Sequence, residues 1–291
     1  MATLSLVSTP IGNLGDLSPR AAETLRSAAR ILAEDTRRTR VLTNHIGARA
    51  PLVSVHQHNE QARIEAILGW LDAGEDLALV SDAGTPLVSD PGGRVVSAVV
   101  EAGHVVLPIP GPSAVLAALA GSGLPTDRFT FLGFPARKGR DRSADLDRVA
   151  QSEESTVLFE SPNRLVGLLE DLEKRCGAAR RVSVARELTK LHEEFVRGTL
   201  PEVAAYYRER PPRGEVTLVV APAADDGDAA EDLREEAARL AAVLLGEGLK
   251  PSAVARELTR RLDLARNEAY RIVHDSRDAT GASPDHATTD E

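Results

Sequence analysis

Cysteine is almost absent from this sequence, and long apolar runs are absent altogether. The single cysteine, Cys176, has no partner for an internal disulfide bond, and one thiolate cannot build a multi-cysteine zinc site. No stretch approaches the ~20 uncharged apolar residues of a membrane-spanning helix. The first residues, MATLSLVSTPIGNLGD, lack the basic segment and apolar run of a secretory signal. We therefore expect a soluble cytoplasmic protein that does not contact a membrane.

Positive charge is also in short supply. The chain has 35 Lys and Arg residues against 44 Asp and Glu residues, which gives a net charge of −9. This deficit argues against a protein that coats nucleic acid by charge alone, but it leaves room for a local basic surface. The content of 42% hydrophobic and 27% charged residues is that of a folded globular chain. At ~150 residues per domain, the length suffices for two domains and a small third one.

The first part of the chain, 1–120, alternates short apolar strands with helical stretches. Such alternation predicts βαβ units and a mostly parallel sheet, in other words an α/β domain. A serine followed by proline before 19–29 marks one helix start, and a glycine after 36–45 marks one helix end. The predicted strands are 4–8, 31–33, 53–55, 77–80 and 104–107, and the predicted helices are 19–29, 36–45, 59–73 and 93–102.

A second α/β domain is predicted over 121–222, after the Gly-rich and Pro-containing stretch 121–125. Its expected strands are 129–132, 156–159, 182–185, 193–197 and 215–220, the last two antiparallel to their neighbours, with a helix over 162–175. The acidic stretch 223–232 is interpreted as a linker to a helical module, 233–277, whose turns predict a helix-turn-helix-like unit. A small helical bundle that packs on the second domain is the plain alternative. The polar tail, 278–291, is expected to be disordered.

Three turns that follow predicted strands carry the informative residues: 8–16, 81–93 and 108–114. Each is rich in glycine and proline, which permit close backbone approach to a ligand and stiffen the loop. Any one of them alone is typical of a plain strand-to-helix connection. Because the carboxyl ends of parallel strands share one edge of a sheet, the three together predict a small-molecule pocket. Neither a phosphate-binding P-loop motif nor a G-x-G-x-x-G motif after the first strand is present.

These loops, in this order, resemble the tetrapyrrole-methylase superfamily, and within it the bacterial ribosomal RNA small-subunit methyltransferase I family. The resemblance covers residues 4–220 and is carried by LSLVSTPIGNLGDLSPRA, ILAEDTRRTRVLTNHIG, LALVSDAGTPLVSDPGG, PIPGPSAVLAAL, SGLPTDRFTFLGFPARKG, TVLFESPNRL and VARELTKLHEEFVRGTL. It implies a two-domain fold with an interdomain cleft and S-adenosylmethionine as methyl donor. It further implies 2′-O-methylation of a cytidine ribose in 16S rRNA, a small-subunit partner and a homodimer.

The resemblance also implies which residues contact the methyl donor. Many superfamily members have Gly-Asp-Pro where this chain has Gly84-Thr85-Pro86, a departure that argues against a corrin or porphyrin substrate. The implied donor contacts are Pro10, Gly12, Asp82, Gly84, Thr85, Pro86, Val88, Ser113, Ala114, Phe159 and Leu188.

A ribose hydroxyl is a poor nucleophile, so a nearby carboxylate could take its proton as it attacks the methyl group. The candidates at predicted strand ends are Glu34, Asp35, Glu160 and Glu187, of which Glu160, Glu187 and Asp35 rank first. Lys190 or Arg186 could lower the hydroxyl pKa by its charge. A helix N-terminal carboxylate or a salt bridge to an arginine is the plain alternative for each carboxylate.

Basic residues gather in three stretches of this acidic chain, and together they predict a footprint for the RNA backbone. A solvated surface is the plain alternative for any one of them. Between residues 250 and 277 there are seven cations against four acidic residues. The proposed RNA contacts are Arg37 and Arg38 at one helix start, Arg137, Lys138 and Arg140 after a strand, and Arg266 and Arg271 in the last helix.

Three other functions stay open from the sequence. A tetrapyrrole methylase would leave the basic stretches unexplained. A metal-dependent hydrolase could use His56, His58, Asp82 and Asp90, although a polar strand end is the simpler interpretation and we expect no metal site. A non-catalytic RNA-binding factor is the third.

Overall fold

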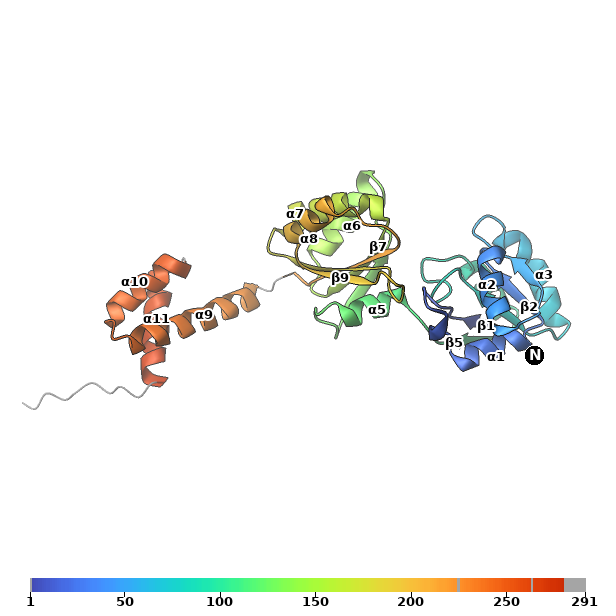
Figure 1. Cartoon of the computed structure of the whole chain (residues 1–291), viewed down its shortest axis with the longest axis horizontal. Helices are drawn as coiled ribbons and strands as arrows, with labels where there is room; N and C mark the ends of the chain where they lie inside the picture. The colour runs from blue at the N-terminus through green and yellow to red at the C-terminus, as the bar shows by residue number, and fades with distance from the viewer. Residues whose placement is uncertain (1, 224–225, 263, 280–291) are drawn as a thin grey trace, which may run out of the picture. The chain divides into compact units, whose positions relative to one another are not determined.

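The computed structural model describes residues 2–223, 226–262 and 264–279 of the chain, which divides into one unit up to Ala223 and a second from Ala224. The first unit contains two five-stranded sheets (Figure 1). No helix in the described ranges is both long enough and apolar enough to cross a bilayer.

The first sheet is entirely parallel, as predicted, with the strand order β3-β2-β4-β1-β5. Its two faces are covered by separate apolar clusters, one around Leu4 and Leu79 and the other around Val7 and Val80. The strands are β1 (Thr3–Val7), β2 (Arg30–Ala33), β3 (Leu52–Ser54), β4 (Leu77–Val80) and β5 (Val105–Ile109). The helices between them are α1 (Pro19–Ser27), α2 (Thr36–Ile46), α3 (Glu60–Asp72) and α4 (Gly93–Glu101), with a 3₁₀ turn, η1 (Leu14–Asp16).

The second sheet is mixed, with the order β6-β7-β10-β8-β9. Strand β6 runs parallel to β7, whereas β10 is antiparallel to both of its neighbours and β9 is antiparallel to β8, as predicted for the last two strands. The strands are β6 (Phe129–Gly133), β7 (Ser155–Glu160), β8 (Arg181–Arg186), β9 (Glu194–Thr199) and β10 (Val216–Val220). The helices are α6 (Gly139–Ala150), α7 (Leu165–Cys176) and α8 (Leu200–Glu209), with the 3₁₀ turn η2 (Pro162–Arg164) before α7.

Helix α5 (Ala114–Gly121) joins the two halves of the first unit. It follows β5 of the first sheet but packs on β7, β8 and β10 of the second sheet (Figure 1). Val115, Ala118 and Leu119 of α5 share a buried cluster with Val157 and Val219 of the second sheet. Ile11, from the loop after β1, belongs to the same cluster. The second sheet is therefore held against the loop edge of the first.

Three helices were not predicted from the sequence. Helix α5 is built of Ala, Val, Leu and Gly alone, so no polar face marks its period. Helix α6 is so rich in charge that its first residues read as a basic loop, and Arg140 in fact lies in its first turn. Helix α8 begins with a capping box, in which Thr199 and Glu202 bond reciprocally at the start of the helix.

The second unit is a three-helix bundle of α9 (Asp226–Gly246), α10 (Pro251–Leu262) and α11 (Arg266–Ala279) around a small apolar core. The prediction that 223–232 is a linker was wrong from Asp226 onward, where α9 begins. Acidic residues are favoured in the first turns of a helix because its N-terminus is electropositive, so an acidic run does not by itself mark a linker. Residues 280–291 of the predicted disordered tail lie outside the described residues.

Candidate functional site

The three loops singled out in the sequence meet at one edge of the first sheet. They follow β1, β4 and β5, which are neighbours in the strand order. The amide of Thr9 donates to the Gly84 carbonyl at 2.9 Å, and the amide of Gly84 donates to the Thr9 carbonyl at 3.0 Å. The Thr85 hydroxyl donates to the carbonyl of Pro112 in the third loop at 3.3 Å. The prediction that these loops converge is therefore confirmed.

The loop after β4 has an unusual backbone. Gly84, Leu87, Ser89 and Gly92 all adopt positive φ angles, of 81°, 73°, 66° and 114°. Non-glycine residues adopt this conformation uncommonly and at a cost in free energy, and such residues cluster at ligand-binding sites. Their concentration here indicates a loop that is shaped for contact with a ligand.

A pocket of about 310 Å³ opens beside this loop, between the two sheets of the first unit. Its lining combines apolar side chains with a few hydroxyls and carboxylates, as is usual for small-molecule sites. The first half of the unit contributes Ile11, Ala83, Gly84, Thr85, Val88, Ser89, Asp90, Ser113, Ala114 and Val115, and the second half contributes Phe134, Phe159, Glu160, Ser161, Pro162, Gly214, Glu215, Val216 and Thr217.

The predicted donor contacts divide into two groups. Six of them line this pocket: Gly84, Thr85, Val88, Ser113, Ala114 and Phe159. The other five lie outside its lining. Pro10 and Asp82 face a separate hollow of about 110 Å³, Leu188 is buried in the cluster around Ile11, and Gly12 packs against residues 188–190. Pro86 follows Thr85 in the strained loop without lining the pocket.

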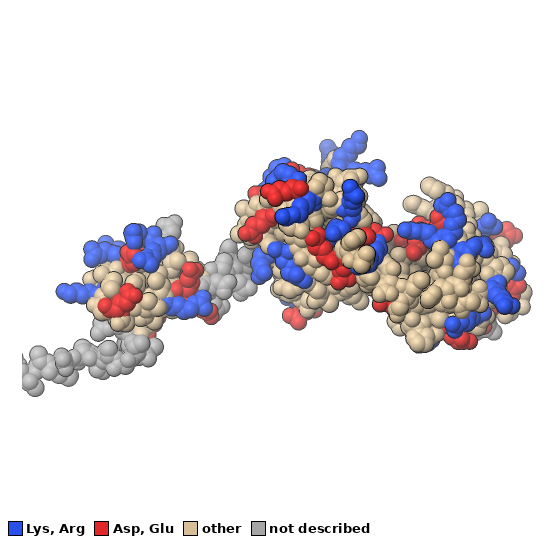
Figure 2. Space-filling view, in the orientation of Figure 1, with Lys and Arg blue, Asp and Glu red and all other residues tan. Residues whose placement is uncertain are grey.

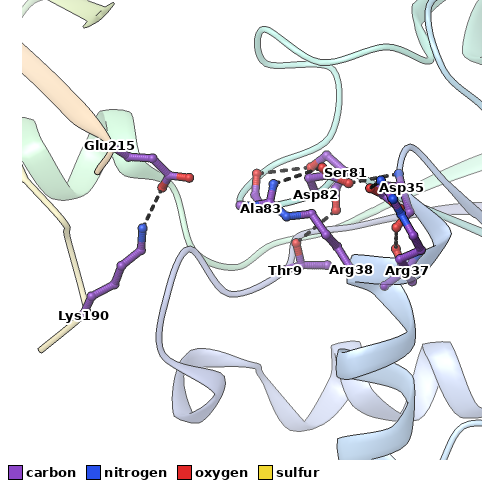
Figure 3. Close-up of polar contacts among 10 residues, drawn as sticks. Thr9, Asp35, Arg37, Arg38, Ser81, Asp82, Ala83, Lys190 and Glu215 are labelled. Carbon is purple, nitrogen blue, oxygen red and sulfur yellow. Dashed lines mark hydrogen bonds and ion pairs between the residues drawn. The ribbon is translucent and has the colours of Figure 1, made fainter. Parts of the chain in front are cut away.

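Asp82 holds neighbouring parts of the chain together (Figure 3). Its carboxylate accepts the backbone amide of Asp35 at 3.0 Å and pairs with the Arg38 guanidinium at 3.0 Å. These contacts fix the end of β2 and the start of α2 to the loop after β4. Asp82 is therefore placed to position this edge of the sheet, whereas the sequence assigned it to ligand contact.

Asp35, a predicted proton acceptor, is occupied elsewhere. It caps α2, and its carboxylate binds the side chain of Arg37 at 2.7 Å. Hydrogen bonds from the side chain and backbone of Arg37 lower the pKa of Asp35 to about 2. A carboxylate with so low a pKa is a weak base, and Asp35 does not line the pocket.

Glu160, at the end of β7, is the one predicted catalytic residue that lines the pocket. Its side chain is fully buried. One carboxylate oxygen, Oε1, accepts the Ser161 amide at 2.7 Å. The other, Oε2, lies 3.1 Å from Nη2 of Arg164 but accepts no hydrogen bond. Glu160 therefore adds to the pocket wall a buried carboxylate that is paired with Arg164 and has unused acceptor capacity.

Glu187 and Lys190 lie at the margin of the pocket. The Lys190 ammonium donates to Glu187 at 2.8 Å. It also donates to Glu215, which lines the pocket, at 3.1 Å (Figure 3). The hydrogen bond from Lys190 lowers the pKa of Glu187. Burial lowers the pKa of Lys190, but its bonds to Glu187 and Glu215 outweigh burial and raise it. Both predicted residues thus orient Glu215, which sequence reasoning missed.

Several pocket residues were missed because they come from the far half of the unit. Phe134, directly after β6, is 59% exposed, with its ring centre 5.4 Å from that of Phe159. Gly214 and Glu215 directly precede β10, so only the antiparallel pairing of that strand brings them here. Asp90 also lines the pocket, although the sequence suggested it only as a metal ligand.

The hydrolase alternative gains no support from the geometry. His56 and His58 lie with ring centres 6.0 Å apart, and Asp82 is paired with Arg38. Among the residues that the structure describes, no group of three His, Cys, Asp or Glu side chains is arranged to hold a metal ion.

The cations predicted to contact RNA differ in whether a carboxylate already pairs with them. Arg37 and Arg38 pair with Asp35 and Asp82, respectively. Arg137, Lys138 and Arg140 are exposed, and Lys and Arg side chains project from the loop before α6 (Figure 2). In the second unit Arg271 is exposed, and Arg266 lies 6.0 Å from the centre of the Tyr270 ring.

Gly12 allows the loop after β1 to touch the 188–190 segment, and we expect its replacement to separate them. An added Cβ would collide with Lys190 Cγ and lie 3.1 Å from the Leu188 carbonyl oxygen. Gly12→Ala should lower the free energy of unfolding by about 1–3 kcal/mol in urea titrations. Gly69→Ala is the control, because nothing surrounds that position in α3, and it should raise stability by up to ~1 kcal/mol. Equal effects of the two changes would contradict this close approach.

Comparison with solved structures supports the fold. The structure resembles uroporphyrin-III-C-methyltransferase from Thermus thermophilus, with a TM-score of 0.56 and 22% identity over 76% of this chain and 94% of that one. It also resembles the methyltransferase CobJ, with a TM-score of 0.60 and 20% identity over 77% of this chain and 95% of that one. A further Thermus thermophilus structure of this type, complexed with S-adenyl homocysteine, has a TM-score of 0.55 and 20% identity over 76% of this chain and 97% of that one. At these identities the likeness concerns the fold alone.

Sequence comparison is more specific. The family described as Tetrapyrrole (Corrin/Porphyrin) Methylases matches residues 3–204. A protein of Synechocystis named ribosomal RNA small subunit methyltransferase I is 46% identical over 94% of this chain and 97% of its own length. Proteins of the same name from Xylella fastidiosa and Bacillus subtilis are 47% and 38% identical, over 87% and 95% of this chain and 92% and 94% of their own lengths. The chain therefore belongs to the ribosomal RNA small subunit methyltransferase I family, within the tetrapyrrole methylases.

Proposed function

We propose that this protein transfers a methyl group from S-adenosylmethionine to the 2′-hydroxyl of a cytidine ribose in 16S rRNA, within the small ribosomal subunit. The observation that carries the proposal is the pocket at the meeting point of the three loops. The chain that forms it matches relatives named ribosomal RNA small subunit methyltransferase I over nearly their full length. A ribosomal substrate implies a cytoplasmic enzyme. The tetrapyrrole alternative has only a likeness of fold in its favour.

The pocket suits the methyl donor. When bound, S-adenosylmethionine supplies a methyl group that is already activated by its sulfonium. A volume of about 310 Å³ falls within the usual range for ligand clefts, ~300–1,000 Å³. The buried carboxylate of Glu160 and the ring of Phe159 both favour a positively charged ligand. The six predicted contacts that line the pocket would hold the donor, while Pro10, Gly12, Asp82, Pro86 and Leu188 would support the loops from outside the pocket.

Positioning accounts for most of the catalysis that we propose. The donor needs no activation, so the enzyme gains mainly by holding two reactants in line. The bonds of Thr9 and Thr85 to their neighbouring loops supply that rigidity. Glu160 is the predicted catalytic residue best placed to act within the pocket, whereas Lys190 and Glu187 act through Glu215.

The RNA backbone would bind the exposed cations of the first unit, Arg137, Lys138 and Arg140. Phe134 begins the same loop and offers an exposed ring on which an unstacked base could rest. Arg266 and Arg271 on α11 would add phosphate contacts from the helical module. Arg37 and Arg38 can contribute only in part, because each is paired with a carboxylate.

A homodimer is also part of the proposal. Strand β5 is the edge of the first sheet, and its Val105 and Leu107 side chains are 43% and 48% exposed. Leu116 on the neighbouring α5 is 55% exposed. An apolar edge strand is a surface that proteins normally cover, and a two-fold copy of the same surface would do so.

Ribose methylation of the 16S rRNA tests the proposed function directly. We expect mass spectrometry to find one 2′-O-methylcytidine missing from a strain that lacks this protein, and restored by the wild-type chain. Thr85→Tyr should not restore it, since the larger side chain would fill the donor pocket. An unchanged methylation pattern in the deletion strain would refute the proposal.

The loop cations are tested by changing Arg137, Lys138 and Arg140 together to alanine. We expect at least tenfold weaker binding to small subunits, and a salt slope smaller by about 0.9 per lost phosphate contact, at unchanged donor affinity. The matched control changes Arg20, Arg49 and Arg63, which are exposed cations elsewhere on the first unit. If both triple variants lose affinity equally, the loop has no special part in RNA binding.

A further inference from the structure

A second hollow adjoins the donor pocket. This polar cavity has a volume of about 880 Å³ and lies between the loop after β4 and helices α3 and α4. It shares two lining residues with the donor pocket, Ser89 and Asp90. Its other walls include Glu34, Gln57, Gln61, Arg94, Ser97 and Glu101. A group bound in the cavity therefore meets a group bound in the pocket at the position of Asp90.

The segment that carries Asp90 is fixed by a hydrogen bond at Gly92 and passes close to the end of β6. The buried carboxylate of Glu60, on α3, accepts the amide of Gly92 at 2.8 Å. On the other side, the Ser89 hydroxyl lies 3.2 Å from where a Cβ on Gly133 would be, at the end of β6. With Ser89 at a φ of 66° and Gly92 at 114°, the backbone turns on both sides of Asp90. Asp90 is thus held at the junction of the two hollows.

The surroundings of Asp90 make its carboxylate more basic than usual. Burial and the nearby charge of Asp82 raise the pKa of Asp90, while a hydrogen bond from Ser81 acts in the opposite direction. Glu34, directly after β2, interacts with Asp90. Burial and the charges of Asp82 and Asp90 raise the pKa of Glu34, whereas the charge of Arg38 lowers it. A more basic carboxylate is a better proton acceptor at neutral pH.

We propose that the polar cavity receives the target cytidine, turned out of the RNA stack, and that Asp90 accepts the proton of its ribose hydroxyl. This inference rests on the proposed function. The hydroxyl oxygen bonds to the methyl carbon as the carbon–sulfur bond breaks, and the electron pair of that bond stays on sulfur. The hydroxyl proton passes to a carboxylate oxygen of Asp90 and from there to water.

The lining of the cavity fits a base better than a phosphate. Among the described residues, Arg94 is the one cation of the lining, and it already lies 3.4 Å from Glu60. The carboxylates and amides of Glu34, Gln57, Gln61 and Glu101 offer acceptors, which suit the amino group of cytosine. Enzymes that modify a nucleotide commonly turn it out of the stack into such a pocket.

The role of Asp90 is tested with Asp90→Asn and, as the control, Asp127→Asn, which changes an exposed carboxylate before β6. Single-turnover methylation of small subunits that lack the modification should slow by at least ~10²-fold for Asp90→Asn and not for the control. The affinity for S-adenosylhomocysteine, measured by calorimetry, should stay within threefold.

The wild-type rate should fall with acidification as Asp90 is protonated, and Asp90→Asn should lose that dependence. A rate within threefold of wild type, with the acid limb intact, would overturn the assignment. A wild-type protein that methylates no small subunit would instead refute the proposed function, and this inference with it.

The cavity is tested separately by filling it. Ser97→Trp, on α4, should raise the KM for small subunits at least tenfold and leave S-adenosylhomocysteine binding unchanged. Ser27→Trp is the matched control, because both hydroxyls donate to the carbonyl four residues earlier on an exposed helix surface. An unchanged KM for Ser97→Trp would place the target cytidine elsewhere and overturn the proposal.

Discussion

The reciprocal hydrogen bonds between Thr9 and Gly84 are the contact on which the rest of the site depends. Parallel strands bring their carboxyl ends to one edge, but adjacency alone leaves their loops free to diverge. The paired amides join the loop after β1 to the loop after β4, and Thr85 extends the connection to Pro112. The positive φ angles of the middle loop then become possible, because its ends are held by neighbours. The pocket wall is a consequence of this backbone network more than of any single side chain.

The second sheet completes the pocket because α5 crosses to it. Strand β5 ends at the first sheet, but the next helix buries Val115 and Leu119 against the second one. Ile11 enters the same cluster, and Gly12 lets its loop touch the 188–190 segment. The pocket and the protein core are thereby built in part from shared residues. We infer that changes in the α5 cluster alter ligand binding together with stability.

The sequence predicted the first sheet and its three loops because apolar strand patterns and glycine–proline turns are local signals. It also identified six residues of the pocket wall through the family resemblance. It did not predict the contacts of Asp82 with Asp35 and Arg38, since no local pattern reveals where this side chain turns. It missed Phe134 and Glu215 because long-range packing of the two halves brings them to the pocket. Asp90 lies in the predicted loop 81–93, but the sequence suggested it only as a metal ligand. The helical start at Asp226 was missed because an acidic run looks the same in a linker and in a first helical turn.

The pocket and the polar cavity meet at Asp90, and we assign a different binding role to each of them. The apolar pocket is suited to the donor, the polar cavity to a nucleoside, and the exposed cations to the RNA backbone.

The most direct measurement is hydrogen–deuterium exchange of the full chain with and without S-adenosylhomocysteine. We expect slower exchange in all three loops, 8–16, 81–93 and 108–114, and at the start of β10. Protection that spares these loops, or that is confined to α9–α11, would contradict the assignment of the pocket to the methyl donor.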